Sequence, residues 1–153
     1  MPTYDVFDEY RYFEPAKTFN IVEYQGKRIA VTVCEDIWND EKFWGKRNYA
    51  DDPVAELATN HELDLLLNLS ASPYAVGKQN LRESMLSHSA IMHNLPLIYA
   101  NQVGANDDLI FDGRSMAFDR SGKIIARGKG FEEDLLVINL DDELNLTPSR
   151  YES

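Results

Sequence analysis

The sequence predicts a mixed α/β fold in a single layered domain. A length of 153 residues is typical of one domain rather than two. Short apolar runs typical of buried strands alternate with helical patterns in the first two thirds of the chain, and a hairpin pattern follows. This alternation favours helices packed against a sheet.

Seven short runs are predicted to be strands, because they are rich in apolar and β-branched residues and are bounded by turn residues. The dipeptide Gln25-Gly26 predicts a tight hairpin between the first two runs, and residues 120–122 predict another between the fifth and sixth. The predicted strands are residues 18–24, 27–33, 63–69, 97–103, 115–119, 123–127 and 135–140.

The second of these runs predicts an interior strand. Successive side chains alternate between the two faces of a strand. Ile29, Val31 and Val33 therefore share one face, while Ala30, Thr32 and Cys34 share the other. Both faces are apolar, and we therefore expect both to be covered by other parts of the protein.

Two helices are predicted. The acidic pair before Pro53 suits a helix start, because a carboxylate caps free N–H groups and proline is tolerated in the first turn, and this helix should end near His61. Residues 78–95 show the clearest helical period, which Pro96 ends. Their apolar stripe, with spacings of four and three residues, consists of Leu81, Met85, His88, Met92 and Leu95.

The end of the chain is expected to lie outside the core. The residues after Leu140 are acidic and include Pro148, which predicts a connecting segment. We therefore expect a domain over residues 1–142 and a tail or linker over residues 143–153. The glycine-bounded segment 104–113 is expected to be a surface loop.

Charge and cysteine content argue against several classes of function. The formal net charge is −11, which repels nucleic-acid phosphates and anionic membrane surfaces. No apolar run reaches the ~18 residues of a membrane span, and the charged first twenty residues contain no signal-peptide core. The single cysteine excludes an internal disulfide and any multi-thiolate metal site, and it favours a cytoplasmic protein.

Cys34 is a candidate nucleophile because it ends a buried strand, where α/β sheets present catalytic groups. The alternative is a small buried hydrophobic residue. Glu35 and Asp36 follow directly and would raise the thiol pKa, so a reactive Cys34 needs a cation or a base from elsewhere. No histidine has a companion at metal-ligand spacing, and His88 suits a structural role. The hydroxyl-rich segment 68–77 could supply hydrogen-bond donors to a small polar substrate.

Four segments carry a more specific signal. They are Pro2-Thr3-Tyr4-Asp5-Val6-Phe7-Asp8-Glu9 with Arg11-Tyr12-Phe13, Val33-Cys34-Glu35-Asp36-Ile37-Trp38, Asn68-Leu69-Ser70-Ala71-Ser72-Pro73, and Phe111-Asp112-Gly113-Arg114-Ser115-Met116. In this order they resemble the carbon–nitrogen hydrolase (nitrilase) superfamily and, within it, the glutaminase domains of glutamine-dependent NAD synthetases. The resemblance covers nearly the whole chain.

The resemblance implies an αββα sandwich with a Glu–Lys–Cys triad. Cys34 would attack the side-chain amide of glutamine, release ammonia and form a thioester that water hydrolyses. Glu9 resembles a second glutamate that orients the substrate. The positions that match the family's glutamine-binding contacts are Tyr4, Glu35, Trp38, Ser72 and Lys78, where some members carry arginine at the last position.

The resemblance also implies partners. The ammonia would pass to a separate synthetase domain, which uses ATP and magnesium to amidate nicotinic acid adenine dinucleotide to NAD. No cofactor is expected in this chain itself, and a homo-oligomer is expected.

The chain departs from the family pattern at its start. The triad lysine is expected just before the segment that corresponds to residues 1–4, and the triad glutamate further upstream, while Lys17 and Lys27 lack the lysine's sequence context. We therefore expect only the C-terminal part of the sandwich, nearly inactive alone, with exposed apolar surface that favours self-association. The alternatives are an amidase acting on another small amide, a catalytically dead binding or assembly paralogue, and an unrelated α/β domain with a structural cysteine. An ATP-binding domain encoded downstream would favour the synthetase.

Overall fold

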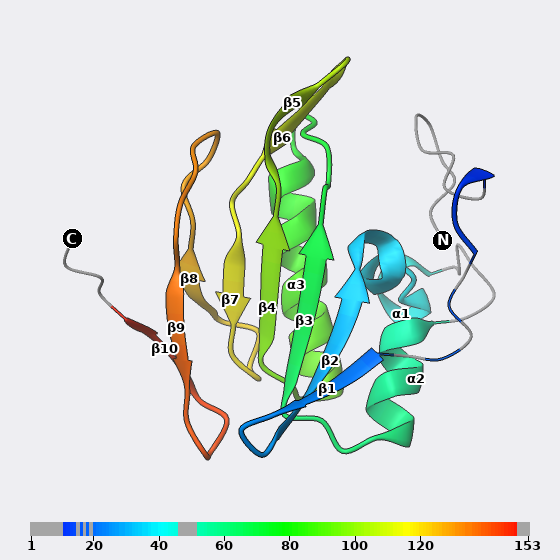
Figure 1. Cartoon of the computed structure of the whole chain (residues 1–153), viewed down its shortest axis with the longest axis vertical. Helices are drawn as coiled ribbons and strands as arrows, with labels where there is room; N and C mark the ends of the chain where they lie inside the picture. The colour runs from blue at the N-terminus through cyan, green and yellow to red at the C-terminus, as the bar shows by residue number, and fades with distance from the viewer. Residues whose placement is uncertain (1–10, 15, 17, 19, 46–51, 150–153) are drawn as a thin grey trace.

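The computed structural model describes residues 11–14, 16, 18, 20–45 and 52–149. Its centre is a mixed sheet of six strands in the order β1-β2-β3-β4-β7-β8 (Figure 1). The middle strands β2, β3 and β4 are parallel, whereas β1, β7 and β8 run antiparallel to their neighbours. The strands are β1 (Asn20–Tyr24), β2 (Lys27–Val33), β3 (Leu65–Ser70), β4 (Leu97–Asn101), β7 (Met116–Phe118) and β8 (Ile124–Arg127).

All seven predicted strands are present, with ends shifted by a few residues. Both predicted hairpins form, and Gln25 and Gly26 adopt the positive φ angles that a two-residue hairpin turn requires. β2 lies between β1 and β3, which confirms it as an interior strand.

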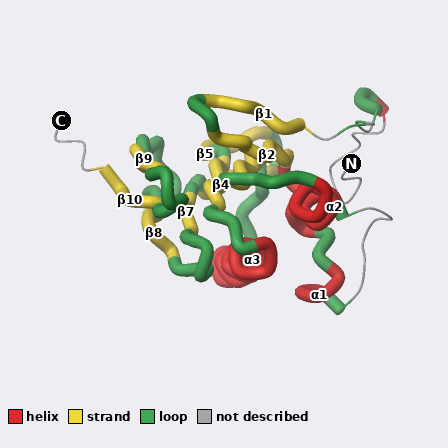
Figure 2. The backbone as a smooth tube through the Cα atoms, turned by 90° about the horizontal axis from the view of Figure 1, so that it is seen from below, coloured by secondary structure: helices red, strands yellow, loops and turns green. Residues whose placement is uncertain are grey.

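Helices α2 (Pro53–Asn60) and α3 (Lys78–His93) cover one face of the sheet (Figure 2). The Asp52 side chain caps α2 by accepting a hydrogen bond from the Ala55 N–H at 3.0 Å, as the acidic pair before Pro53 predicts. No helix in the described part of the chain has the length and apolar character that crossing a membrane requires. The core between helices and sheet includes Ala30, Val54, Leu57, Leu66, Met85, Leu86, Ala90, Leu97, Tyr99 and Phe118.

The buried stripe of α3 differs from the predicted one. Leu81 and Met92 are exposed, and the buried positions are Arg82, Met85, Leu86, Ser89 and Ala90. The helix is therefore rotated so that an arginine points inward and two apolar residues point outward. The apolar pattern missed this because Arg82 is buried through an ion pair, which hydropathy alone does not register.

The face of the sheet opposite the helices is only partly covered. Val33 is 57% exposed and Leu69 is 45% exposed, so the expectation that both faces of β2 are covered is wrong for the described part of the protein. A hairpin of β9 (Val137–Leu140) and β10 (Leu146–Ser149) lies near β8 and shields only that end of the sheet (Figure 2).

Several elements were not predicted. A 3₁₀ turn, η2 (Cys34–Trp38), and a short helix, α1 (Glu41–Trp44), follow β2, and segment 104–113 is mostly a hairpin of β5 (Val103–Asn106) and β6 (Leu109–Asp112) rather than a loop. The expectation that the chain after Leu140 lies outside the core is wrong at β10, which pairs with β9 and buries Leu146. The domain boundary near residue 142 stays a prediction.

Candidate active site

Cys34 lies at the end of β2, where the chain turns sharply into η2. It adopts φ +48°, a left-handed conformation that is uncommon outside glycine and that concentrates at functional sites. The Asp36 carboxylate stabilises this turn by accepting a hydrogen bond from the Val33 N–H at 2.8 Å. Asp36 thus supports the backbone of the turn, which presents the thiol at the strand end.

Burial raises the pKa of the Cys34 thiol, and the Glu35 carboxylate raises it further. The backbone N–H groups of Ala71 and Glu35, which are directed at the sulfur, and the nearby Lys78 ammonium act in the opposite direction without cancelling the shift. The direction agrees with the sequence-based expectation, but burial is a larger cause than the neighbouring carboxylate. Activation of this thiol needs a further cation or base.

Lys78 is the first residue of α3 and points its ammonium towards η2. Its Nζ atom lies 5.5 Å from the centroid of the Trp38 ring, within reach of a cation–π contact. The Trp38 ring is in turn stacked on Trp44, with centroids 5.9 Å apart and planes inclined by 13°. Burial lowers the pKa of Lys78, while the Cys34 and Glu35 charges oppose that shift.

Ser72 lies in the loop after β3, one residue beyond the Ala71 N–H that faces the thiol. The Ser72 side chain is buried, and its backbone N–H donates to Asn101 Oδ1 at 2.9 Å. Burial raises the pKa of the Tyr99 hydroxyl, whereas the hydroxyls of Ser70 and Ser72 lower it, so these three side chains lie together beneath the site.

A match to a family profile assigns the chain to a protein family. The profile described as "Carbon-nitrogen hydrolase" matches residues 2–148. The chain belongs to the carbon–nitrogen hydrolase family. The alternative of an unrelated α/β domain is therefore wrong.

Individual relatives agree with the carbon–nitrogen hydrolase assignment. The chain is 54% identical over 141 residues to the glutamine-dependent NAD(+) synthetase of Synechocystis sp., covering 92% of this chain and 25% of that protein. It is 42% identical over 149 residues to the glutamine-dependent NAD(+) synthetase of Thermotoga maritima, covering 97% of this chain and 24% of that protein. The chain spans about a quarter of the length of these relatives.

A solved structure confirms the nitrilase-type α/β fold. The glutamine-dependent NAD+ synthetase from Acinetobacter baumannii superposes with a TM-score of 0.83 at 35% identity, covering 99% of this chain and 27% of that one. A carbon–nitrogen hydrolase from Helicobacter pylori, 24% identical, shares the fold with a TM-score of 0.70.

The structure brings most predicted site residues of this carbon–nitrogen hydrolase together. Cys34, Glu35, Trp38 and Lys78 meet where β2 ends and α3 begins, and Ser72 lies on the adjoining loop. Tyr4 and Glu9 lie outside the described residues. The sequence reasoning missed the Ala71 N–H, Asn101, Arg82 and Asp112. A polar residue that ends a parallel strand was the available signal for Asn101.

The histidines take structural or peripheral positions. His88 Nε2 lies 3.0 Å from Asp40 Oδ2, a contact that joins α3 to the capping residue of α1 and agrees with the structural role predicted for His88. Among the residues that the structure describes, no group of three or more histidine, cysteine or acidic side chains is placed to hold a metal ion.

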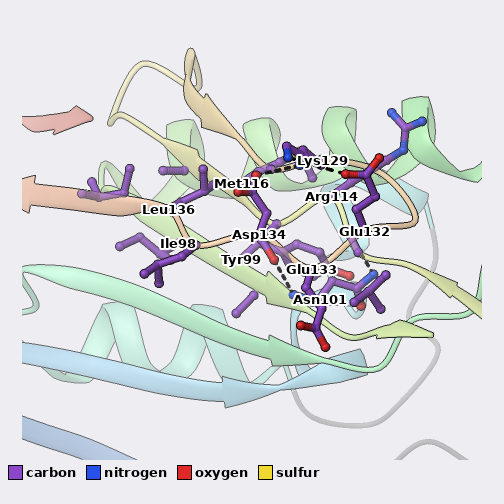
Figure 3. A pocket seen from close by; sticks show the side chains of 18 residues that line it. Ile98, Tyr99, Asn101, Arg114, Met116, Lys129, Glu132, Glu133, Asp134 and Leu136 are labelled. Carbon is purple, nitrogen blue, oxygen red and sulfur yellow. Dashed lines mark hydrogen bonds and ion pairs between the residues drawn. The ribbon is translucent and has the colours of Figure 1, made fainter. Parts of the chain in front are cut away.

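A separate cavity of about 610 Å³ lies on the partly covered face of the sheet (Figure 3). Ile98 from β4 and Ala117 from β7, which are paired across the two strands, line it on the side of the sheet. Glu132, Glu133 and Asp134 from the loop after β8 surround it. Cys34 does not line this cavity, so the cavity is not the reaction site.

Proposed function

We propose that this carbon–nitrogen hydrolase chain supplies the nucleophile and part of the substrate-binding wall of a glutaminase site. The arrangement around Cys34 carries the proposal: a thiol presented at a strand end, two backbone N–H groups directed at the sulfur, and the Lys78 ammonium beside it. Cysteine-dependent amide hydrolysis needs a nucleophile, donors for a developing negative charge, and a cation that favours the thiolate.

In the proposed reaction the Cys34 sulfur attacks the side-chain carbonyl carbon of glutamine, and the carbonyl electron pair moves to oxygen. The tetrahedral adduct then collapses, the C–N bond breaks, and the nitrogen takes a proton and leaves as ammonia. Water hydrolyses the thioester to glutamate and restores the thiol. Burial keeps the pKa of Cys34 raised despite Lys78, so this reaction needs a further base and a further cation, the roles that the family resemblance gives to a triad glutamate and lysine.

The charges around Cys34 suit an amino acid substrate. Free glutamine carries a carboxylate and an ammonium group. The Lys78 ammonium is a complementary partner for the substrate carboxylate, and the Glu35 carboxylate is a complementary partner for the substrate ammonium. The Trp38 ring, held by Trp44, offers a flat wall for the aliphatic part of the substrate. Contributions from Ser72, Tyr4 and Glu9 stay predictions of the family resemblance.

The relatives support a proposal about the wider function. Proteins similar to this chain over a quarter of their length are glutamine-dependent NAD(+) synthetases. From the family resemblance we further propose that the site belongs to a cytoplasmic, homo-oligomeric protein whose further domain uses ATP and magnesium to transfer the ammonia to nicotinic acid adenine dinucleotide.

The test is Cys34-dependent release of ammonia from glutamine, measured on the 153-residue chain and on the full product of the reading frame that encodes it. Cys34→Ala is the matched blank for each protein. For the full product we expect this substitution to lower the rate by at least about 100-fold. For the 153 residues alone we expect no release above the blank, because loss of a general base costs about 10²–10⁴ in rate.

The outcomes separate the alternatives. Ammonia release from acetamide or another small amide, but not from glutamine, would identify an amidase instead. Absence of Cys34-dependent release from every amide in the full product would identify a catalytically dead paralogue. Robust release by the 153 residues alone would show that the chain supplies its own base and cation.

A further inference from the structure

The segment from Leu109 to Ser115 comprises strand β6 and the residues after it, and it contains most of the Phe111–Met116 motif that contributes to the family resemblance, but it has no part in the proposed reaction. In the structure this segment contacts both elements that carry substrate-binding candidates. The Tyr74 N–H donates to the Ile110 carbonyl at 2.7 Å, and Pro73 forms a β-bridge with Phe111. Strand β6 therefore fixes the loop that contains Ser72 and the Ala71 N–H.

Asn101 links the same segment to Ser72 directly. Its side-chain oxygen accepts from the Ser72 N–H at 2.9 Å, and its side-chain nitrogen donates to the Gly113 carbonyl at 2.9 Å. The Asn101 N–H donates to Ser115 Oγ at 3.0 Å. The amide side chain of Asn101, at the end of β4, thus satisfies one group from the Ser72 loop and one from the residues after β6, which fixes their separation.

A buried ion pair links the segment to α3. Arg82 Nη1 and Nη2 each lie 3.1 Å from Asp112 Oδ1, and both side chains are at most 1% exposed. Arg82 lies four residues after Lys78 on the same helix, and its guanidinium carbon lies 5.8 Å from the Tyr99 ring centroid. A two-pronged, charge-assisted contact of this kind fixes orientation as well as distance.

The charges of this pair bear on Lys78. Burial lowers the pKa of Lys78 and the Arg82 charge lowers it further, whereas Asp112 acts against that shift. If Asp112 lost its charge, the Arg82 guanidinium would keep its hydrogen bond to Gln79 Oε1 but would lose its carboxylate partner, one turn from Lys78 in a buried setting. That arrangement would repel the ammonium and displace the first turn of α3.

We infer that Asp112 is a positioning residue: through Arg82 it holds the first turn of α3 and keeps the Lys78 ammonium facing the Cys34 thiol, which gives the site its preference for substrates with an anionic group. The inference rests on the proposed function for the identity of that substrate, an amino acid amide with a free carboxylate. The Asp112–Arg82 ion pair, and the position of Lys78 one turn before Arg82 on α3, do not depend on the proposed function.

The test uses the 153-residue chain and its single thiol. The second-order rates of Cys34 alkylation by iodoacetate, an anion, and by iodoacetamide, a neutral amide, are measured by mass spectrometry. Their ratio reports the charge that a reagent meets at the thiol. We expect Lys78→Met and Asp112→Asn each to lower the iodoacetate-to-iodoacetamide ratio about three- to tenfold, the effect of one unit charge at close range.

The direction of change makes this readout specific. Asp112→Asn removes a negative charge, so a simple field effect would raise the ratio for the anionic reagent, opposite to the inference. Asp119→Asn, which removes one carboxylate from the β7–β8 turn, is the matched control and should leave the ratio within twofold. The chain unfolded in urea provides the rates of an unprotected thiol.

The inference is overturned if the Asp112→Asn ratio is unchanged or raised in a folded protein, or if Lys78→Met leaves the ratio unchanged. If Cys34 in the Asp112→Asn variant reacts at the rates of the urea-unfolded chain, that variant is not folded, and Arg82→Lys replaces it in the test. This substitution keeps both charges of the ion pair but loses the two-pronged contact. A lowered ratio in that variant supports the inference, and an unchanged ratio overturns it. None of these readouts requires glutamine hydrolysis, so failure of the proposed function remains separately visible in the ammonia assay.

Discussion

The two faces of the central sheet differ in how far they are covered. On the helix-covered face, Leu66 and Leu97 are at most 1% exposed and belong to the core beneath α2 and α3. On the opposite face of the sheet, Leu69 of β3 and Val33 of β2 are about half exposed, and a cavity of about 610 Å³ lies beneath the loop after β8.

The two faces of the sheet therefore contribute differently to the stability of the fold and to the candidate active site. The covered face provides the packed core and also holds the Arg82–Asp112 pair, which reaches from the core to the site. The thiol lies at the end of β2, next to the half-exposed Val33, and depends on contacts from loops for its surroundings. The fold of this chain therefore rests mainly on one face, and side chains of equal size should differ in their effect by face.

The largest effect should come from a matched pair in β3. Leu66→Ala on the covered face should lower the free energy of unfolding by about 2–5 kcal/mol, because it removes buried methyl groups and leaves a cavity. Leu69→Ala on the open face should cost less than about 1 kcal/mol, because its side chain is already half hydrated. Urea unfolding followed by circular dichroism measures both values.

Repeating the pair at two protein concentrations tests the comparison itself. If Leu69→Ala costs as much as Leu66→Ala at high concentration only, the open face is covered by a second copy, as the expected self-association requires. If the two costs are equal at every concentration, the contrast between the faces does not hold in solution.

A smaller effect is expected at two glycines with nearly the same backbone conformation. Gly122 has φ +77° and Gly26 has φ +75°, so alanine costs a similar conformational penalty at each. An added Cβ at Gly122 would lie 2.5 Å from Ser87 Oγ and 2.8 Å from Ile91 on α3, whereas Gly26 faces open space. Gly122→Ala should therefore lower the free energy of unfolding by about 1–3 kcal/mol more than Gly26→Ala. Equal losses would mean that the β7–β8 turn does not pack against α3.

The sequence predicted the strands well because their signals are local. The apolar runs and the turn residues Gln25-Gly26 and 120–122 specify strands and hairpins without knowledge of their neighbours. The orientation of α3 was not predictable in this way, because burying Arg82 depends on Asp112, thirty residues further along the chain. The β5–β6 hairpin was missed because its polar residues read as a loop.

The candidate active site was predicted only in part, because only some of its residues have a local signal in the sequence. Position at a strand end indicated Cys34, and the resemblance supplied Glu35, Trp38, Ser72 and Lys78. The residues that position them act through contacts between distant segments, which no local pattern reveals; they are Asn101, Arg82 and Asp112. Asp112 does lie in one of the four segments that carry the resemblance, but that segment alone did not show its contact with Arg82. Sequence reasoning therefore identified the reacting groups more readily than the groups that position them.

The smallest effect is expected at Asp119, which belongs to the β7–β8 turn and to neither packed face. Burial acts to raise the pKa of its carboxyl group, but hydrogen bonds from Ser121 and the Lys123 N–H outweigh this and lower the pKa. A lowered pKa means that the charged form stabilises the fold at neutral pH, and that this contribution is lost as the pH falls through the folded-state pKa. The difference in unfolding free energy between the wild type and Asp119→Asn should therefore shrink as the pH falls from about 5 to about 3. Because the turn is largely solvated, the difference at pH 7 should stay below about 1 kcal/mol. A difference that grows on acidification would contradict the assignment of the lowered pKa to this turn.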